Sequence, residues 1–235
     1  MRTNGVRCLL MGGQACVFYG AAEFSRDLDL VILPDEGSLE TLRRGLVALD
    51  AAPIAIPRLD GAVLDRGHAV HFRCRAPGVE GLRIDLMARM RGVAPFAELW
   101  ERRTTIETNG ALVDLLSLPD LVQAKKTQRD KDWPMIRRLV EQSWYSATEP
   151  TAAAVTFWLR ELRTPGLLIQ AARQHPDAAA GCHRDAVQLA LAGDLSGLEA
   201  ALQAEESAER AADRAYWEPL KRELEQLRLG WRTSG

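Results

Sequence analysis

The sequence predicts an α/β (α+β) protein, with a mixed β-sheet core flanked by helices in its N-terminal part and an all-helical C-terminal part. Short apolar runs with strand-like alternation recur before residue 90 and end at glycine or proline turns. From residue 151 to 228 the chain is rich in alanine and leucine at helical spacing, without a strand pattern. The length of 235 residues allows two packed parts, which we expect at residues 1–148 and 149–235.

A strand, a glycine turn and a short helix are predicted near the start of the chain. Residues 7–11 form a short apolar run that favours a strand. The run ends at Gly12 and Gly13, a pair that favours a turn. Residues 14–19 are compatible with a short helix that Gly20 closes.

The second predicted strand carries two aspartates on one of its faces. It covers residues 27–32 and is stopped by Pro34. Because side chains alternate along a strand, Asp27 and Asp29 lie on the same face. The opposite face carries the apolar residues Leu28, Leu30 and Ile32.

An amphipathic helix and a hairpin are predicted next. Leucines recur at helical spacing across residues 38–49, which favours a helix packed on the sheet. Two further strands, residues 68–74 and 82–87, are joined by the turn-forming residues 76–78. Alternation along the second of these strands places Asp85 where it can face the two aspartates of the earlier strand.

Helices are predicted from residue 117 onward. A capping-box pattern at residues 117–120 starts a helix that runs through Lys125 and Lys126. Residues 133–134, Trp-Pro, begin a second helix. The helical tail that follows is interrupted near Pro165, Pro176 and Gly193.

Composition and charge argue against several classes of partner. The formal net charge of −2 disfavours a broad phosphate-binding surface, so extended duplex DNA is not expected, although a local basic groove is allowed. No stretch approaches the roughly 20 apolar residues of a membrane span, so no membrane partner is expected. The four cysteines show no zinc-type spacing, and no secretory leader is recognisable, so we expect reduced thiols and a cytoplasmic location.

Three carboxylates converging from two strands would suit metal-dependent phosphoryl transfer. Such transfer depends on positioning and charge neutralisation, which divalent ions held by oxygen ligands supply. Asp27, Asp29 and Asp85 could form this site. A D-x-D pair alone is a weak signal, since two surface aspartates give the same pattern, and a glycine pair alone often marks only a turn. Gly12 and Gly13 add bare backbone N–H groups that could meet a triphosphate.

Three segments together resemble the nucleotidyltransferase superfamily, in its minimal polymerase-beta-like form. They are residues 11–20 (MGGQACVFYG), 24–31 (FSRDLDLV) and 83–87 (RIDLM). The resemblance is nearest to the bacterial abortive-infection toxin nucleotidyltransferases. It continues through Leu-Ser-Leu-Pro-Asp-Leu at residues 116–121, through Lys125 or Lys126, and through Lys131-Asp132, and it covers residues 7–142.

The resemblance implies an enzyme that moves a nucleotide from a nucleoside triphosphate, such as ATP, to an acceptor. Asp27, Asp29 and Asp85 would hold Mg²⁺ or Mn²⁺, with Asp85 also helping to activate the acceptor hydroxyl. The nucleotide phosphates would be bound by Gly12, Gly13, Ser25 and Lys125 or Lys126.

The acceptor and even the activity stay open at this stage. A small molecule, a protein side chain and a tRNA end all fit as acceptors. Where the toxin-like pattern has an arginine, this chain has Glu23, which would disfavour a triphosphate unless it points away or is paired. The alternative is a non-catalytic nucleotide-binding or interaction protein of the same fold, as in a toxin–antitoxin pair. A cognate protein or a second copy of the chain could be its partner.

Overall fold

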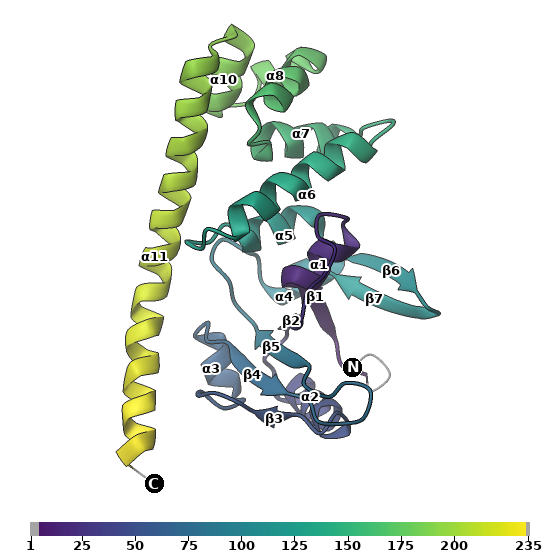
Figure 1. Cartoon of the computed structure of the whole chain (residues 1–235), viewed down its shortest axis with the longest axis vertical. Helices are drawn as coiled ribbons and strands as arrows, with labels where there is room; N and C mark the ends of the chain where they lie inside the picture. Colours follow the sequence, from purple (N-terminus) through teal and green to yellow (C-terminus); the bar gives the residue numbers. More distant parts are fainter. Residues whose placement is uncertain (1–4, 234–235) are drawn as a thin grey trace. The chain divides into compact units, whose positions relative to one another are not determined.

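The computed structural model describes residues 5–233 and divides them into two compact units (Figure 1). The first unit comprises the described residues up to Ala124 together with those from Ala215 onward. The second unit is Lys125–Arg214. The boundary that we expected between residues 148 and 149 falls inside the second unit.

The first unit contains a seven-stranded mixed sheet, in the order β3-β4-β5-β2-β1-β7-β6. The β2–β5 and β1–β7 pairs are parallel, and the other neighbours are antiparallel. The mixed sheet with flanking helices confirms the predicted fold class. The strands are β1 (Cys8–Met11), β2 (Asp27–Ile32), β3 (Ala52–Pro53), β4 (Val70–Arg73), β5 (Arg83–Met87), β6 (Thr104–Thr108) and β7 (Ala111–Leu115).

The predicted strands that carry the aspartates are confirmed as β2 and β5, and the predicted hairpin is confirmed as the antiparallel pair of β4 and β5. The helix that follows β1 begins at Gly12, two residues earlier than expected. The glycine pair therefore opens the helix and does not form a separate turn. The helices of this part of the chain are α1 (Gly12–Phe18), α2 (Glu36–Ala48), α3 (Gly61–Asp65), α4 (Phe96–Glu101) and α5 (Leu118–Lys125).

The core of the first unit is formed by alternate residues of the central strands and by one face of α2. In β5, Ile84 and Leu86 are fully buried, whereas the residues between and beside them are half-buried. The leucines of α2 that were predicted to face the sheet are buried at helical spacing, namely Leu39, Leu42 and Leu46. This alternation fixes the register of the sheet, because a shift of one residue would expose the buried set.

Helix α2 begins with a side-chain cap from Asp35. Its carboxylate accepts hydrogen bonds from the Ser38 backbone N–H at 3.0 Å and from the Ser38 hydroxyl at 2.6 Å. These hydrogen bonds lower the pKa of Asp35. We expect Asp35→Ala to reduce the free energy of unfolding by about 1 kcal/mol, and Asp35→Asn to retain most of it, because asparagine also caps helices well. Urea denaturation of both variants would measure this. Equal losses of stability in the two variants would show that the Asp35 side chain does not cap the helix.

The part of α11 (Leu195–Thr233) that belongs to the first unit packs near the start of β4. Glu223 accepts a hydrogen bond from Arg66 at 2.7 Å and lies 3.1 Å from the buried ring of His68. Between these two residues, a Cβ added to Gly67 would approach the Tyr216 hydroxyl to 3.1 Å. Residues near the end of the chain thus complete the first unit.

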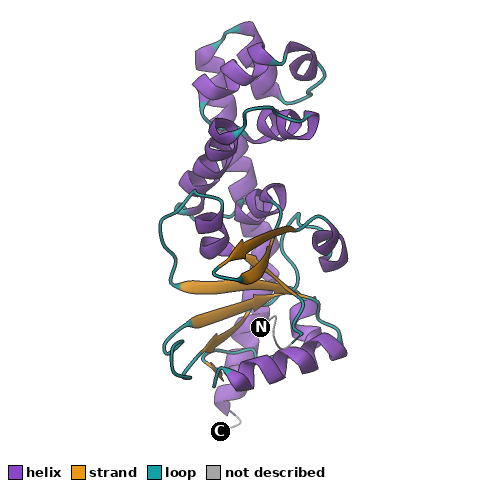
Figure 2. Ribbon diagram, turned by 90° about the vertical axis from the view of Figure 1, so that its right-hand side faces the viewer, coloured by secondary structure: helices purple, strands orange, loops and turns teal. Residues whose placement is uncertain are grey.

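The second unit consists of helices and loops in its described residues, as predicted for the C-terminal part (Figure 2). Its helices, with the N-terminal part of α11, are α6 (Asp132–Ser146), α7 (Ala152–Glu161), α8 (Pro165–Gln174), α9 (Pro176–Ala180) and α10 (Asp185–Ala192). Apolar residues from several of these helices are fully buried, among them Trp133, Leu139, Leu168 and Val187. Across residues 5–233, none of the helices has the length and apolar character needed to cross a bilayer.

Candidate functional site

The structure brings the three predicted aspartates onto two adjacent strands. In the parallel pairing of β2 with β5, Asp29 lies directly opposite Asp85, and Asp27 lies opposite Arg83. Directly opposed residues share a face of the sheet, so all three carboxylates belong to the same face. Their half-burial at the start of the two strands leaves them partly open to solvent. The candidate carboxylates are therefore neighbours in space as well as members of a motif.

The two glycines pack closely against other candidate residues. Gly12 has a φ of +67°, and a Cβ there would fall 2.5 Å from Cγ and 2.8 Å from Cβ of Asp29. A Cβ on Gly13 would fall 2.9 Å from Cβ of Ser25. The backbone at this point can approach Asp29 and Ser25 so closely only because neither residue carries a side chain.

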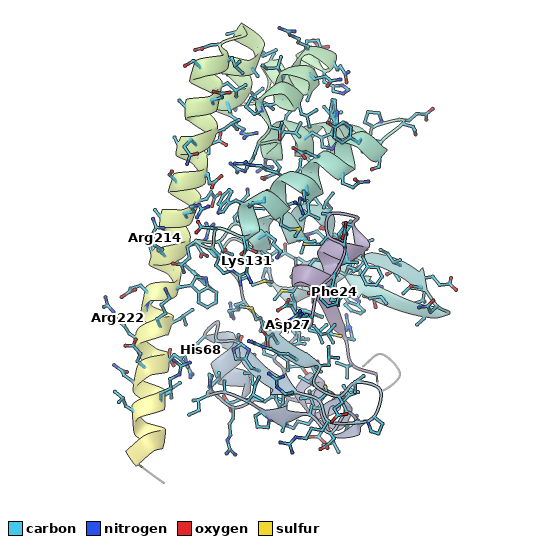
Figure 3. The ribbon with its side chains drawn as sticks, in the orientation of Figure 1. Phe24, Asp27, His68, Lys131, Arg214 and Arg222 are labelled. Atoms are coloured by element: carbon cyan, nitrogen blue, oxygen red, sulfur yellow. The ribbon has the colours of Figure 1, made fainter. Side chains whose placement is uncertain are left out.

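Hydrogen bonds hold the segment between α1 and β2 that carries Ser25. The Gln14 side-chain amide donates to the Ser25 carbonyl at 2.7 Å, and the Ser25 hydroxyl donates to the Asp27 carbonyl at 3.4 Å. Glu23 in the same segment is exposed. The neighbouring Phe24 leaves 71% of its surface exposed. Figure 3 labels Phe24 and Asp27, the latter at the start of β2.

Two further polar residues, Arg83 and His71, belong to the site although the sequence analysis assigned them no role in it. Arg83 donates through Nε to Oδ1 of Asp85 at 2.8 Å. His71 lies opposite Asp85 in the β4–β5 pair, with Nδ1 also 2.8 Å from Oδ1. The Arg83 guanidinium and the His71 ring are themselves 3.2 Å apart. Both partners thus meet the same oxygen of Asp85.

Electrostatics keep Asp85 ionised. Burial raises the pKa of its carboxyl, but the hydrogen bonds from His71 and Arg83 outweigh burial, so the pKa is lowered overall. The hydrogen bond to Asp85 raises the pKa of Arg83, and the charges of Asp27 and Asp29 raise it further. A guanidinium therefore lies within the field of all three carboxylates.

The donor set suits a hard divalent cation, but the side chains do not form a prearranged cage. Carboxylate oxygens are the ligands that Mg²⁺ prefers. Among residues 5–233, however, no group of three or more histidine, cysteine, aspartate or glutamate side chains is arranged so that it could hold a metal ion. Arg83 and His71 contact Oδ1 of Asp85 instead.

The predicted phosphate-binding lysines lie in the second unit, where each is paired with a carboxylate. Lys125 lies 3.1 Å from Asp132, and Lys126 lies 2.9 Å from Glu161. Both lysine side chains are about nine-tenths buried, with 11% and 8% exposure. Their predicted role at the nucleotide stays a prediction. Because each charge is already balanced by a carboxylate, each lysine has less to offer a triphosphate.

Comparisons with known proteins give likenesses among solved structures only. No protein-family model and no curated protein sequence matches the chain. The fold resembles the crystal structure of an antigenic nucleotidyltransferase-like protein from Paracoccidioides brasiliensis, with a TM-score of 0.41 and 19% sequence identity. The likeness covers 76% of this chain and 85% of that one. A likeness of this size assigns neither a family nor an activity.

Proposed function

We propose that the first unit is a metal-dependent nucleotidyltransferase, which moves a nucleotide from a nucleoside triphosphate to an acceptor hydroxyl. The observation that carries the proposal is the strand register that sets Asp29 beside Asp85 on the face shared with Asp27. The backbone of Gly12, packed directly against Asp29, supports it further. Because Gly12 has no side chain, the backbone N–H groups at the start of α1 lie beside the carboxylates, where they could contact a triphosphate.

The three aspartates have distinct roles in this proposal. Asp27, Asp29 and Asp85 would hold Mg²⁺ or Mn²⁺, which would neutralise phosphate charge and favour departure of pyrophosphate. Asp85 has both of its described contacts on Oδ1. Oδ2 is therefore the oxygen that can accept a hydrogen bond from the acceptor hydroxyl. The lowered pKa of Asp85 keeps that oxygen unprotonated at neutral pH.

Arg83 and His71 fix the orientation of Asp85. An arginine and a histidine on the same carboxylate oxygen restrict rotation of that carboxylate. Ser25 is held beside Gly13, where its hydroxyl can contact a phosphate oxygen. The proposed site thus combines a carboxylate held ready to accept the proton with backbone N–H groups and a hydroxyl for the phosphates.

The acceptor class stays open among a small molecule, a protein side chain and a tRNA end. The formal net charge of −2 slightly favours the first two, because RNA affinity depends on phosphate neutralisation. Membership of the toxin-like branch is part of the proposal and rests on the sequence pattern around residues 116–132.

A second candidate is a nucleotide-binding protein of the same fold without catalysis. The observation that favours it is the Arg83 guanidinium among the carboxylates, together with the lack of a ready-made metal cluster in the described part of the chain. In such a protein Arg83 would replace part of the charge that a metal ion supplies.

The test is calorimetric titration of ATP, GTP, CTP and UTP, each with and without Mg²⁺. Wild type is compared with an Asp27→Asn/Asp29→Asn double variant and with Asp50→Asn. Asp50 is exposed and has a φ of 44°, which asparagine also adopts, so this variant controls for loss of one acidic group. Transfer is followed in parallel with a labelled triphosphate and a pool of cell-extract acceptors.

Three outcomes separate the candidates. Metal-dependent binding and label transfer that persist in Asp50→Asn and disappear in the double variant support the enzyme. Triphosphate binding without transfer favours the second candidate. Equal binding with and without Mg²⁺, or none, contradicts the assignment of the three aspartates.

A further inference from the structure

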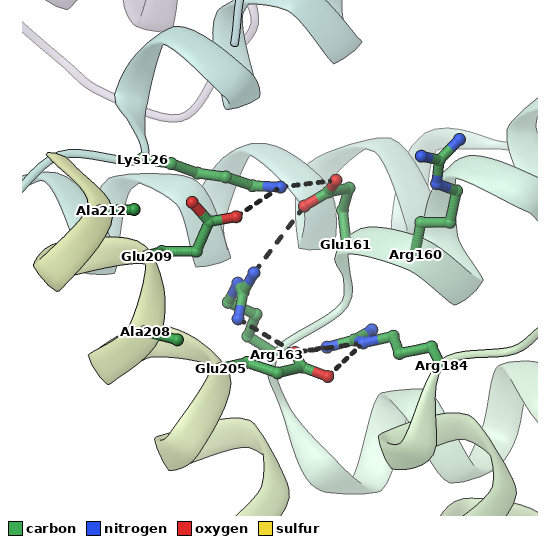
Figure 4. Close-up of a pocket in the computed structure, with 9 residues that line it drawn as sticks. All are labelled: Lys126, Arg160, Glu161, Arg163, Arg184, Glu205, Ala208, Glu209 and Ala212. Carbon is green, nitrogen blue, oxygen red and sulfur yellow. Dashed lines mark hydrogen bonds and ion pairs between the residues drawn. The ribbon is translucent and has the colours of Figure 1, made fainter. Parts of the chain in front are cut away.

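A charged cavity of ≈ 500 Å³ lies within the second unit (Figure 4). Its volume is in the range of small-molecule sites. Seven of its nine lining residues are ionisable, and the other two are alanines of α11. The lining residues are Lys126, Arg160, Glu161, Arg163, Arg184, Glu205, Ala208, Glu209 and Ala212. All of these residues belong to the second unit, and none of them is a candidate aspartate of the first unit.

Three carboxylates in the cavity wall are shared among its cations. Glu205 pairs with Arg184 at 2.7 Å and with Arg163 at 3.3 Å. Lys126 pairs with Glu161 at 2.9 Å and is 3.8 Å from Glu209. Arg163 also lies 4.0 Å from Glu161, so among the described residues Arg163 and Lys126 each have two carboxylates nearby, whereas Arg184 has one.

Positive charge is in excess in the wall. Four cations face three carboxylates, and the side chain of Arg160 has neither a hydrogen bond nor an ion pair with the described residues. Figure 4 shows its guanidinium apart from the network of dashed contacts. The unmatched cation is exposed, so a solute can reach it.

Arg163 is the buried cation of the wall that has an unsatisfied side-chain nitrogen. Its side chain is 5% exposed, and its Nε has no hydrogen-bond partner among the described residues. Burial lowers the pKa of Arg163, and the neighbouring charge of Arg184 lowers it further. An additional negative charge in the cavity would relieve both effects.

We propose that this cavity binds a small molecule bearing a phosphoryl dianion, either free phosphate or a phosphate monoester. Arg160 offers a planar guanidinium group, which suits phosphate oxygens, and Arg184, held by Glu205, adds positive charge to the wall. Ala208 and Ala212 lie one helical turn apart on α11, and both are exposed, so short side chains keep this wall open. The site belongs to the second unit alone and does not depend on the proposed transferase activity.

The test uses calorimetric titration of the metal-free protein with sodium phosphate, glycerol 3-phosphate and disodium succinate, at ionic strength held constant with sodium chloride. Ala208→Glu adds a carboxylate at the cavity wall on an exposed helical position, so the fold is preserved. Ala211→Glu is its matched control, because Ala211 is exposed on the same helix and does not line the cavity. Arg160→Gln removes the unmatched cation.

We expect saturable binding of phosphate or its monoester in wild type and in Ala211→Glu. Ala208→Glu and Arg160→Gln should each weaken it by about fivefold or more, as expected for one charge changed at close range. Preference for the monoester over phosphate would identify an organic phosphate as the ligand, and the reverse would identify free phosphate. No saturable binding, equal affinity in the two glutamate variants, or succinate binding as tightly as phosphate would each overturn the proposal.

Discussion

Replacing Gly12 with alanine is expected to lower the free energy of unfolding by roughly 2–4 kcal/mol, combining strain at positive φ with overpacking. The new Cβ would fall 2.5 Å from Cγ and 2.8 Å from Cβ of Asp29. Rotating the carboxylate cannot relieve a clash with Cβ, so the β1–β2 backbone must shift as well. Because Asp29 moves with it, the metal-dependent triphosphate binding that we propose should also be lost. Denaturant unfolding and calorimetry of the same sample measure both effects.

Gly110→Ala is the matched control for this prediction. Gly110 also has a positive φ, +71°, but a Cβ there would have nothing within 4 Å. The Gly110→Ala variant should therefore lose only about 1–2 kcal/mol of stability, from alanine at a positive φ, and its triphosphate binding should be unchanged. Equal losses of stability in the two variants would show that the approach of Gly12 to Asp29 does not constrain the fold.

The other large effect is expected at Asp132, which is 2% exposed at the start of α6. Its carboxylate accepts from Lys125 at 3.1 Å, from the Thr127 hydroxyl at 2.6 Å and from Arg129 at 2.7 Å. Asp132→Asn leaves the nearly buried Lys125 without a counter-charge, which should cost about 3–5 kcal/mol in stability. The control is Asp130→Asn, since the Asp130 side chain is 98% exposed, and it should change stability little.

The effect of Asp132 should depend on pH. Burial raises the pKa of its carboxyl, but Lys125, Thr127 and Arg129 outweigh burial, so the pKa in the folded protein is lowered from 3.8. A group of this kind stabilises the fold fully above its unfolded pKa and loses that contribution as pH falls through the folded pKa. The stability gap between wild type and Asp132→Asn should therefore narrow only below about pH 4. A gap unchanged down to pH 2 would contradict the ionised state of Asp132.

Short-range patterns were sufficient to predict the strands that carry the aspartates. Alternation in β2 and β5 identified the face of Asp27, Asp29 and Asp85, and the turn at residues 76–78 identified the β4–β5 hairpin. These features depend only on the neighbours of each residue. The direct opposition of Asp29 and Asp85 depends on how two strands far apart in the sequence are paired. The structure was needed to establish this register.

The partners of Asp85 illustrate what a sequence pattern leaves undetermined. Arg83 precedes Asp85 by two residues and so shares its strand face, a signal that could have identified it. His71 lies on a different strand from Asp85 and was not singled out by the sequence. Its actual partner follows from the cross-strand register of β4 with β5. Whether a histidine faces a carboxylate depends on that register to within one residue.

The β6–β7 hairpin was absent from the sequence analysis although its turn has a recognisable signal. Asn109 and Gly110 both have positive φ, as a two-residue hairpin turn requires, and Asn-Gly is typical of such turns. The flanking strands have few buried residues, with only Asp114 and Leu115 buried. Their weak apolar pattern explains why periodicity alone did not indicate them.

The first unit is assembled from both ends of the chain, and this has a consequence for protein synthesis. Arg66 and His68 meet Glu223 only after the intervening Lys125–Arg214 has been made. At the usual translation rate of about 5–20 residues per second, these 90 residues delay the contact by roughly 5–20 s. Until then the first unit is left with the partners of Glu223 uncovered. Ribosome-bound chains that end before Glu223 should therefore be cleaved by protease more readily near Arg66 and His68 than the full chain.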